Sequence, residues 1–89
     1  MKAVITVLGK DTVGILGKVS TACAEEGVNI IEVTQSVMQD LFAMIMLADI
    51  QNSKITIDEL TKKLDNVTKE MGLKVHVMHE DIFNSMHKI

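Results

Sequence analysis

The sequence predicts a single α+β domain with four strands and two main helices, on three observations. A length of 89 residues suits one domain with a modest core. Two segments of helical periodicity are set among short β-branched runs, in the order strand, helix, strand, strand, helix, strand. With 47% hydrophobic and 24% charged residues, the composition is typical of a globular chain. We therefore expect an antiparallel four-stranded sheet with both helices on one face.

The first strand and the first helix are predicted before residue 27. Residues 3–8 are apolar at nearly every position, which is typical of a central strand covered on both faces. Gly27 is expected to end the following helix, which spans residues 13–26, because glycine readily adopts the left-handed conformation of a helix stop. The apolar stripe of this helix consists of Ile15, Val19, Ala22 and Cys23.

The second and third strands are predicted to form a hairpin. Residues 29–38 are rich in β-branched side chains, and their second face is more polar. Gln39 and Asp40 form a short turn. Residues 41–50 are then apolar on both sides, so they are expected to form a second central strand.

The second helix begins with a capping signature. Thr56 is a suitable N-cap, and Glu59 three residues later completes a capping box. Gly72 is expected to end this helix, and residues 73–79 alternate as a final strand. Its apolar face is predicted from Ile57, Leu60, Leu64, Val67 and Met71. The tail places Ile82, Phe83, Met86 and Ile89 at helical spacing.

This element order is the split βαβ, or ferredoxin-like, plan, with residues 1–80 as the domain and 81–89 as its amphipathic C-terminal extension. Two helices cover one face of a sheet, yet the third strand is apolar on both faces. Its second face, through Met44, Met46 and Ala48 or the residues between them, needs another cover. Either the C-terminal segment or a second subunit could provide it, and we expect a homodimer.

Composition excludes several classes of function. A net charge of −3, no arginine and two phenylalanines as the only aromatic residues argue against nucleic-acid binding. One cysteine excludes an internal disulfide and paired-cysteine metal sites. No apolar run approaches the length of a membrane span, and the N-terminal run lacks a cleavage box. We expect a cytoplasmic protein with no membrane partner.

The segment GKDTVGILGKVS at residues 9–20 raises the question of a phosphate loop. Such a loop needs Gly-Lys-Ser/Thr at its second glycine, whereas Gly14 is followed by two apolar residues, and the dinucleotide spacing also fails. What remains is a helix opening near Thr12 and Gly14, whose free amides and dipole favour an anionic group. Asp11 beside it could accept a bond from an ammonium, so the pair suits an amino acid. The alternative is that Asp11 or Thr12 is simply an N-cap and Gly14 allows close packing.

Other candidate sites are weaker. The three histidines, His76, His79 and His87, could suggest a metal site. His76 and His79 lie three residues apart on a strand and should point to opposite faces, so we expect no metal site. Cys23 lies on the buried stripe and should act as a small hydrophobe. No nucleophile, base and orienting group can be assembled, so we expect no catalytic residues, no cofactor and no enzymatic activity. Two acidic pairs are expected to be solvated, namely Glu25 with Glu26 and Asp58 with Glu59.

Two short motifs resemble the ACT domain, the small-molecule-sensing module of amino-acid metabolism. They are Asp11-x-x-Gly14-Ile15-Leu16 after the first strand and Gly27-Val28-Asn29-Ile30 before the second. The resemblance covers about residues 2–79. The length and the ending IFNSMHKI resemble small single-ACT bacterial proteins, which are similar to the ACT modules of the glycine cleavage repressor and of formyltetrahydrofolate hydrolases. Thr12 and Val13 stand where the family often has a basic residue and proline.

The resemblance implies a non-catalytic regulatory module that binds a small ligand, expected to be an amino acid. The ligand would lie between residues 9–16 and the start of the second strand, often across a subunit interface. A protein partner could receive the signal. The alternative is a structural interaction module with no ligand. The implied ligand-binding residues are Asp11, Thr12, Val13, Gly14, Ile15, Leu16, Asn29 and Ile30.

Overall fold

The computed structural model describes residues 1–10 and 14–86. The elements follow the predicted order, with a short third helix after the last strand. They are β1 (Lys2–Lys10), α1 (Ile15–Glu25), β2 (Asn29–Met38), β3 (Leu41–Asp49), α2 (Ile57–Thr68), a 3-10 turn η1 (Lys69–Met71), β4 (Lys74–His79) and α3 (Glu80–Met86).

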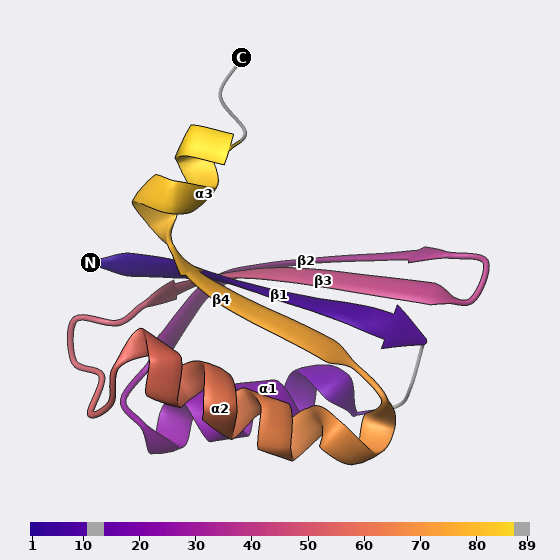
Figure 1. The fold of residues 1–89 in the computed structure, drawn as a ribbon, viewed down its shortest axis with the longest axis horizontal. Helices are drawn as coiled ribbons and strands as arrows, with labels where there is room; N and C mark the ends of the chain where they lie inside the picture. Colours follow the sequence, from indigo (N-terminus) through magenta and orange to yellow (C-terminus); the bar gives the residue numbers. More distant parts are fainter. Residues whose placement is uncertain (11–13, 87–89) are drawn as a thin grey trace.

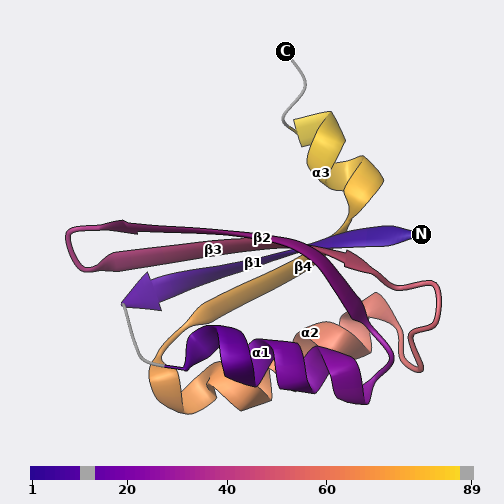
Figure 2. The same cartoon turned by 180° about the vertical axis from the view of Figure 1, so that it is seen from behind.

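The four strands form one antiparallel sheet in the order β2-β3-β1-β4. Helices α1 and α2 lie side by side against one face of this sheet, and α3 rises from the other side (Figures 1 and 2). The predicted ferredoxin-like α+β fold is therefore confirmed. We call the sheet surface opposite α1 and α2 the open face.

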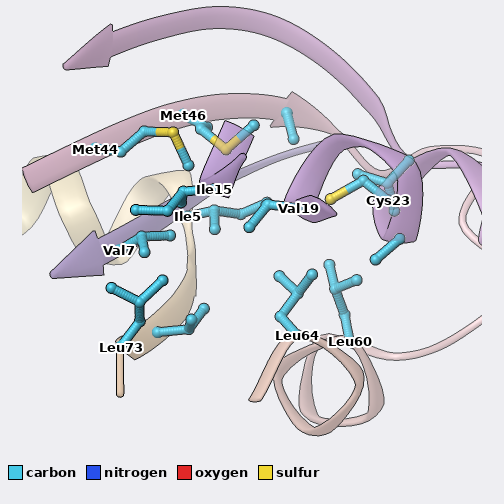
Figure 3. Packing of buried hydrophobic residues seen from close by; sticks show 14 of the residues in the cluster. Ile5, Val7, Ile15, Val19, Cys23, Met44, Met46, Leu60, Leu64 and Leu73 are labelled. Carbon is cyan, nitrogen blue, oxygen red and sulfur yellow. The ribbon is translucent and has the colours of Figure 1, made fainter. Parts of the chain in front are cut away.

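The core lies between the sheet and the two main helices. The register pairs Ile5 with Met46 and Val7 with Met44, so these side chains share the helix-facing side. Figure 3 shows them packed against α1 and α2, with the sulfur atoms of Met44, Met46 and Cys23 inside the cluster. The labelled core residues are Ile5, Val7, Ile15, Val19, Cys23, Met44, Met46, Leu60, Leu64 and Leu73.

Helix α2 begins as predicted but ends earlier. Its capping box is present: the Glu59 amide donates to the Thr56 hydroxyl at 3.1 Å, and the Thr56 amide donates to the Glu59 carboxylate at 3.1 Å. The prediction that the α-helix continues to Met71 is wrong, since the chain tightens into η1 after Thr68. Thr68 is fully buried, because its hydroxyl donates to the Leu64 carbonyl at 2.8 Å and so needs no water.

The open face is shielded at one end only. Val4 lies on it and is 4% exposed, because α3 packs on β1 and β4 at that end. Leu8, on the same strand and the same face, is 38% exposed. The C-terminal helix thus covers part of the open face. Met44, Met46 and Ala48 face the helices, and the residues between them on β3 face outward.

Strand β2 is an edge strand that is exposed along nearly its whole length. Apart from the half-buried Ile30, every residue from Asn29 to Met38 is exposed. By register, Val33 and Val37 lie on the helix-facing side, yet they are 36% and 52% exposed. Strand β2 lies at the edge of the sheet, and Figures 1 and 2 show the β2–β3 hairpin extending beyond the ends of α1 and α2.

Candidate functional site

The strongest candidate site is the start of α1, where three backbone amides have no partner in the described chain. Gly14 is the N-cap with φ 85°, a left-handed conformation that favours glycine. The first helical bond is donated by the Lys18 amide to the Gly14 carbonyl at 3.0 Å. The amides of Ile15, Leu16 and Gly17 therefore precede the first helical hydrogen bond and have no acceptor within the helix, as at any helix start.

The electrostatics of this corner favour a negative group. The first turn of α1 carries no acidic residue to offset the positive end of the helix dipole. Apart from Gly14 itself and its chain neighbours, no described atom lies within 4 Å of the place where a Cβ on Gly14 would stand, so the backbone is approachable there. The arrangement can hold a carboxylate or another small anion through main-chain bonds.

The predicted site residues differ in their environments. Asp11, Thr12 and Val13 lie outside the described residues. Gly14 and Asn29 are exposed, Leu16 and Ile30 are half-buried against the core, and the Ile15 side chain is 2% exposed within it. Ile15, Leu16 and Ile30 therefore anchor the backbone of the corner and of β2.

A single protomer does not bring Asn29 to Gly14. The chain passes along α1 and turns at Gly27 before β2, so the two residues lie at opposite ends of that helix, roughly 16 Å apart at 1.5 Å per residue. The strand register agrees: Asn29 pairs with Asp49 at one end of β3, whereas Gly9, just before the corner, pairs with Phe42 at the other. These two parts of the expected site can meet only between two subunits.

A groove between α1 and α2 was missed by sequence reasoning. Its volume is about 300 Å³, which is at the small end for ligand pockets. Gly17, a helical glycine with nothing within 4 Å of its missing Cβ, helps to open it, and this glycine was the available signal. The lining residues are Gly17, Lys18, Thr21, Ala22, Glu25 and Val67, none of which belongs to the expected site.

The expectation that Glu25 and Glu26 are solvated holds for Glu25, whose side chain is 60% exposed, and is wrong for Glu26. The Lys63 ammonium lies 2.9 Å from the Glu25 carboxylate and 2.6 Å from that of Glu26, and joins α2 to the end of α1. The Glu26 side chain is 21% exposed. Hydrogen bonds first to Glu26 and then to Glu25 raise the pKa of Lys63. The sequence could not show this pairing because 37 residues separate Lys63 from Glu26.

Cys23 and the histidines of β4 show no arrangement for catalysis. Cys23 is fully buried, and burial raises the pKa of its thiol to about 11 against the opposing effect of the Lys63 charge. The register places His76 on the open face and His79 on the other, as predicted. The His79 Nδ1 atom accepts a bond from the Asp81 amide at 3.3 Å. Within residues 1–10 and 14–86, no three histidine, cysteine or acidic side chains converge to hold a metal ion.

The fold defines a small α+β domain of ferredoxin-like topology. The ACT domain family model matches residues 2–78, and the chain belongs to this family. ACT domains are regulatory modules that often bind amino acids. No helix in the described part of the chain combines the length and apolar character needed to cross a membrane.

Similar proteins agree with this assignment. A UPF0237 protein of Clostridium acetobutylicum is 44% identical over 89 residues, which is 100% of both chains. The solved structure of an ACT domain protein from Streptococcus pneumoniae has a TM-score of 0.79 and 32% identity, and covers 93% of each chain. The ligand-free regulatory subunit of aspartate kinase from Thermus thermophilus has a TM-score of 0.65 and 27% identity over 85% of this chain and 49% of that one.

Proposed function

We propose that this chain is a non-catalytic, homodimeric sensor of an amino acid. The ligand carboxylate would bind the free amides at the start of α1 in one subunit. Asp11 would accept a bond from the ligand ammonium, and Asn29 of the second subunit would complete the site. The observation that carries the proposal is the first turn of α1, which contains no acidic residue and whose amides have no partner among the described residues, in a member of a regulatory family.

The exposed edge of β2 supports the dimer. Two β2 strands can pair antiparallel about a two-fold axis perpendicular to the sheet, which satisfies their outward-facing amides and carbonyls. Such pairing places the Asn29 end of one β2 beside the Met38 end of the other. Met38 lies at the same sheet end as Gly9, since Leu41 pairs with Met38 and with Lys10. Asn29 would thus approach the partner's corner, and Val33 and Val37 would come under its helix layer.

A thermal-shift screen against the amino acids tests the proposal. A ligand that binds the folded dimer stabilises it by about 1.4 kcal/mol at a concentration ten times its Kd, by linkage. For a domain of this size that corresponds to a rise in Tm of about 6–11 °C. We expect one amino acid, or a small chemically related group, to give this shift, and the rest to give none.

Matched variants locate the binding site. Asn29→Ala and Asp11→Ala should abolish the ligand-induced shift while leaving the Tm of the free protein nearly unchanged. Asn66→Ala and Asp65→Ala, at exposed positions of α2, are the controls and should keep the full shift. If the Asn29 variant responds like its control, Asn29 is not part of the site.

The second candidate function is an interaction module without a ligand. The observation that favours it is the exposure of β2 on both faces, which suits strand pairing with another protein. A screen in which no amino acid raises the Tm, combined with an unchanged fold, would favour this function over the sensor.

A further inference from the structure

The open face remains uncovered even if β2 pairs with its counterpart, because edge pairing extends a sheet without covering either face. Its exposed apolar side chains are Leu8, Met38, Leu41 and Ile45, and their exposed fractions run from 38% to 68%. Two further large side chains of α3, Ile82 and Met86, are 55% and 65% exposed on the same side of the sheet. Water-exposed apolar surface of this extent marks an interaction site.

The uncovered part of the open face and α3 occupy opposite ends of the strands. Helix α3 shields the end that contains Val4, which pairs with Met78 near the end of β4. The bare end contains Leu8 and Lys74, which pair with each other, and Leu41. A two-fold axis parallel to the sheet and perpendicular to its strands exchanges these ends. It would place α3 of each copy over the end that the other copy leaves bare.

The dimensions fit such an arrangement. Helix α3 has seven residues, so it is about 10 Å long at 1.5 Å per residue, which equals the spacing of about 10 Å between stacked sheets. Figure 1 shows it rising away from the sheet rather than lying across it. Strand length and spacing give the whole open face a projected area of roughly 500 Å², and α3 of the same chain shields one end of it.

The charges at the two ends are complementary. The first turn of α3 is acidic, with Glu80 and an Asp81 side chain that is 87% exposed. The bare end carries Lys10 and Lys74 on the open face, and neither has an ion-pair partner among the described residues. Within one chain, Asp81 and Lys74 are separated by the length of β4. In the two-fold arrangement, each Asp81 approaches the Lys74 of the other copy.

We propose that a second copy of this chain docks on the open face, with each α3 closing over the bare end of the other sheet. This interface is separate from β2 pairing and does not depend on a ligand. If both interfaces form, the assembly is a tetramer of dihedral symmetry. This proposal is therefore independent of the proposed amino-acid site, and either one can fail without the other.

Sedimentation of the full chain tests the interface. We expect Ile45→Glu, a charge at the centre of the open face, to reduce the weight-average mass by half relative to the unaltered protein. Thr61→Glu, on α2 away from the open face, is the control and should keep the mass. Circular dichroism checks that each variant is folded.

A charge exchange provides a second test of the interface in case Ile45→Glu fails to fold. Lys74→Glu and Asp81→Lys should each raise the dissociation constant of the assembly about tenfold, and the double variant should restore it. Reversal of Lys69 or Asp65 on the helix layer should change nothing. A monomeric unaltered protein, a mass insensitive to Ile45→Glu in a folded variant, or no rescue in the Lys74–Asp81 double variant would overturn the proposal. Loss of mass on altering β2, with no loss in a folded Ile45→Glu variant, would assign the assembly to the strand edge instead.

Discussion

Gly27 and Gly17 are both glycines of the α1 region, but the structure gives them opposite roles. Gly27 has φ 76°, and a Cβ there would lie 2.5 Å from the Asn52 carbonyl oxygen. We expect Gly27→Ala to destabilise the protein by about 2 kcal/mol or more, because left-handed backbone strain adds to a clash with main-chain atoms. Urea unfolding measures the loss.

Gly17→Ala is the matched control within the same segment. Gly17 is helical, and a Cβ there meets nothing within 4 Å, so alanine should stabilise the protein by about 0.5–1 kcal/mol. Equal effects of the two substitutions would contradict the role assigned to the Gly27 turn.

Cys23 should be chemically inert in the folded protein. Its side chain is fully buried and its thiol pKa is raised to about 11, so little thiolate forms near neutral pH and reagents cannot reach it. We expect a thiol-reactive probe at pH 8 to label the native protein far more slowly than the protein in denaturant. Native labelling at the denatured rate would show that α1 opens readily from the sheet.

At the scale of elements, the capping box of α2 should make stability depend on pH. The Glu59 carboxylate accepts the Thr56 amide, and this hydrogen bond lowers the pKa of Glu59. A depressed pKa gives stability that is present above the unfolded pKa and is lost as the pH falls through the folded pKa. Glu59→Gln should therefore lower the Tm at pH 7, and the difference from the unaltered protein should shrink towards pH 3.

Thr56→Ala provides the complementary test of the same cap. Removal of the hydroxyl that accepts the Glu59 amide should cost about 1 kcal/mol, as for other N-caps. This loss should persist at acid pH, because the hydroxyl does not titrate. A loss that disappeared with Glu59 protonation would mean that the two halves of the box act only together.

The elements were largely predictable because their signals are local. Apolar periodicity indicated both main helices and all four strands, Thr56 and Glu59 marked the start of α2, and Gly27 marked the end of α1, whereas Gly72 caps the 3-10 turn η1. The end of α2 was predicted three residues too late, since Met71 continues the apolar spacing while the backbone has already tightened after Thr68. The burial of Thr68 was missed because its carbonyl partner within the helix removes the cost of a buried hydroxyl.

For the whole molecule, hydrogen exchange should reveal which strand is an edge. Strand β1 pairs with β3 and β4, so its amides should exchange slowly at every protein concentration. Strand β2 pairs only with β3 among the described strands, and its outward amides should exchange faster. If β2 pairs with its counterpart, exchange there should slow as protein concentration rises. Dimers without this change would place the interface elsewhere.

The candidate site was less predictable than the fold. The sequence indicated the helix opening near Gly14, because a glycine after a strand and before an apolar helical stripe is a local pattern. The predicted element order also places Asn29 directly after α1, at the far end of that helix from Gly14. The sequence could not indicate that Lys63 joins Glu25 and Glu26, because that pairing depends on packing of α2 against α1.

By itself the sequence determined the order of the elements, the apolar stripes of the two main helices and the absence of aromatic or arginine-rich surface, since these follow from residue type and spacing. The tertiary structure alone decided which face of β3 is buried, how far α3 shields the opposite face, and that β2 is exposed on both sides. The physical reason is that the exposure of a sheet face depends on which element or subunit packs on it. A strand that is apolar on both faces is identical in sequence whether its own chain or a second copy covers it.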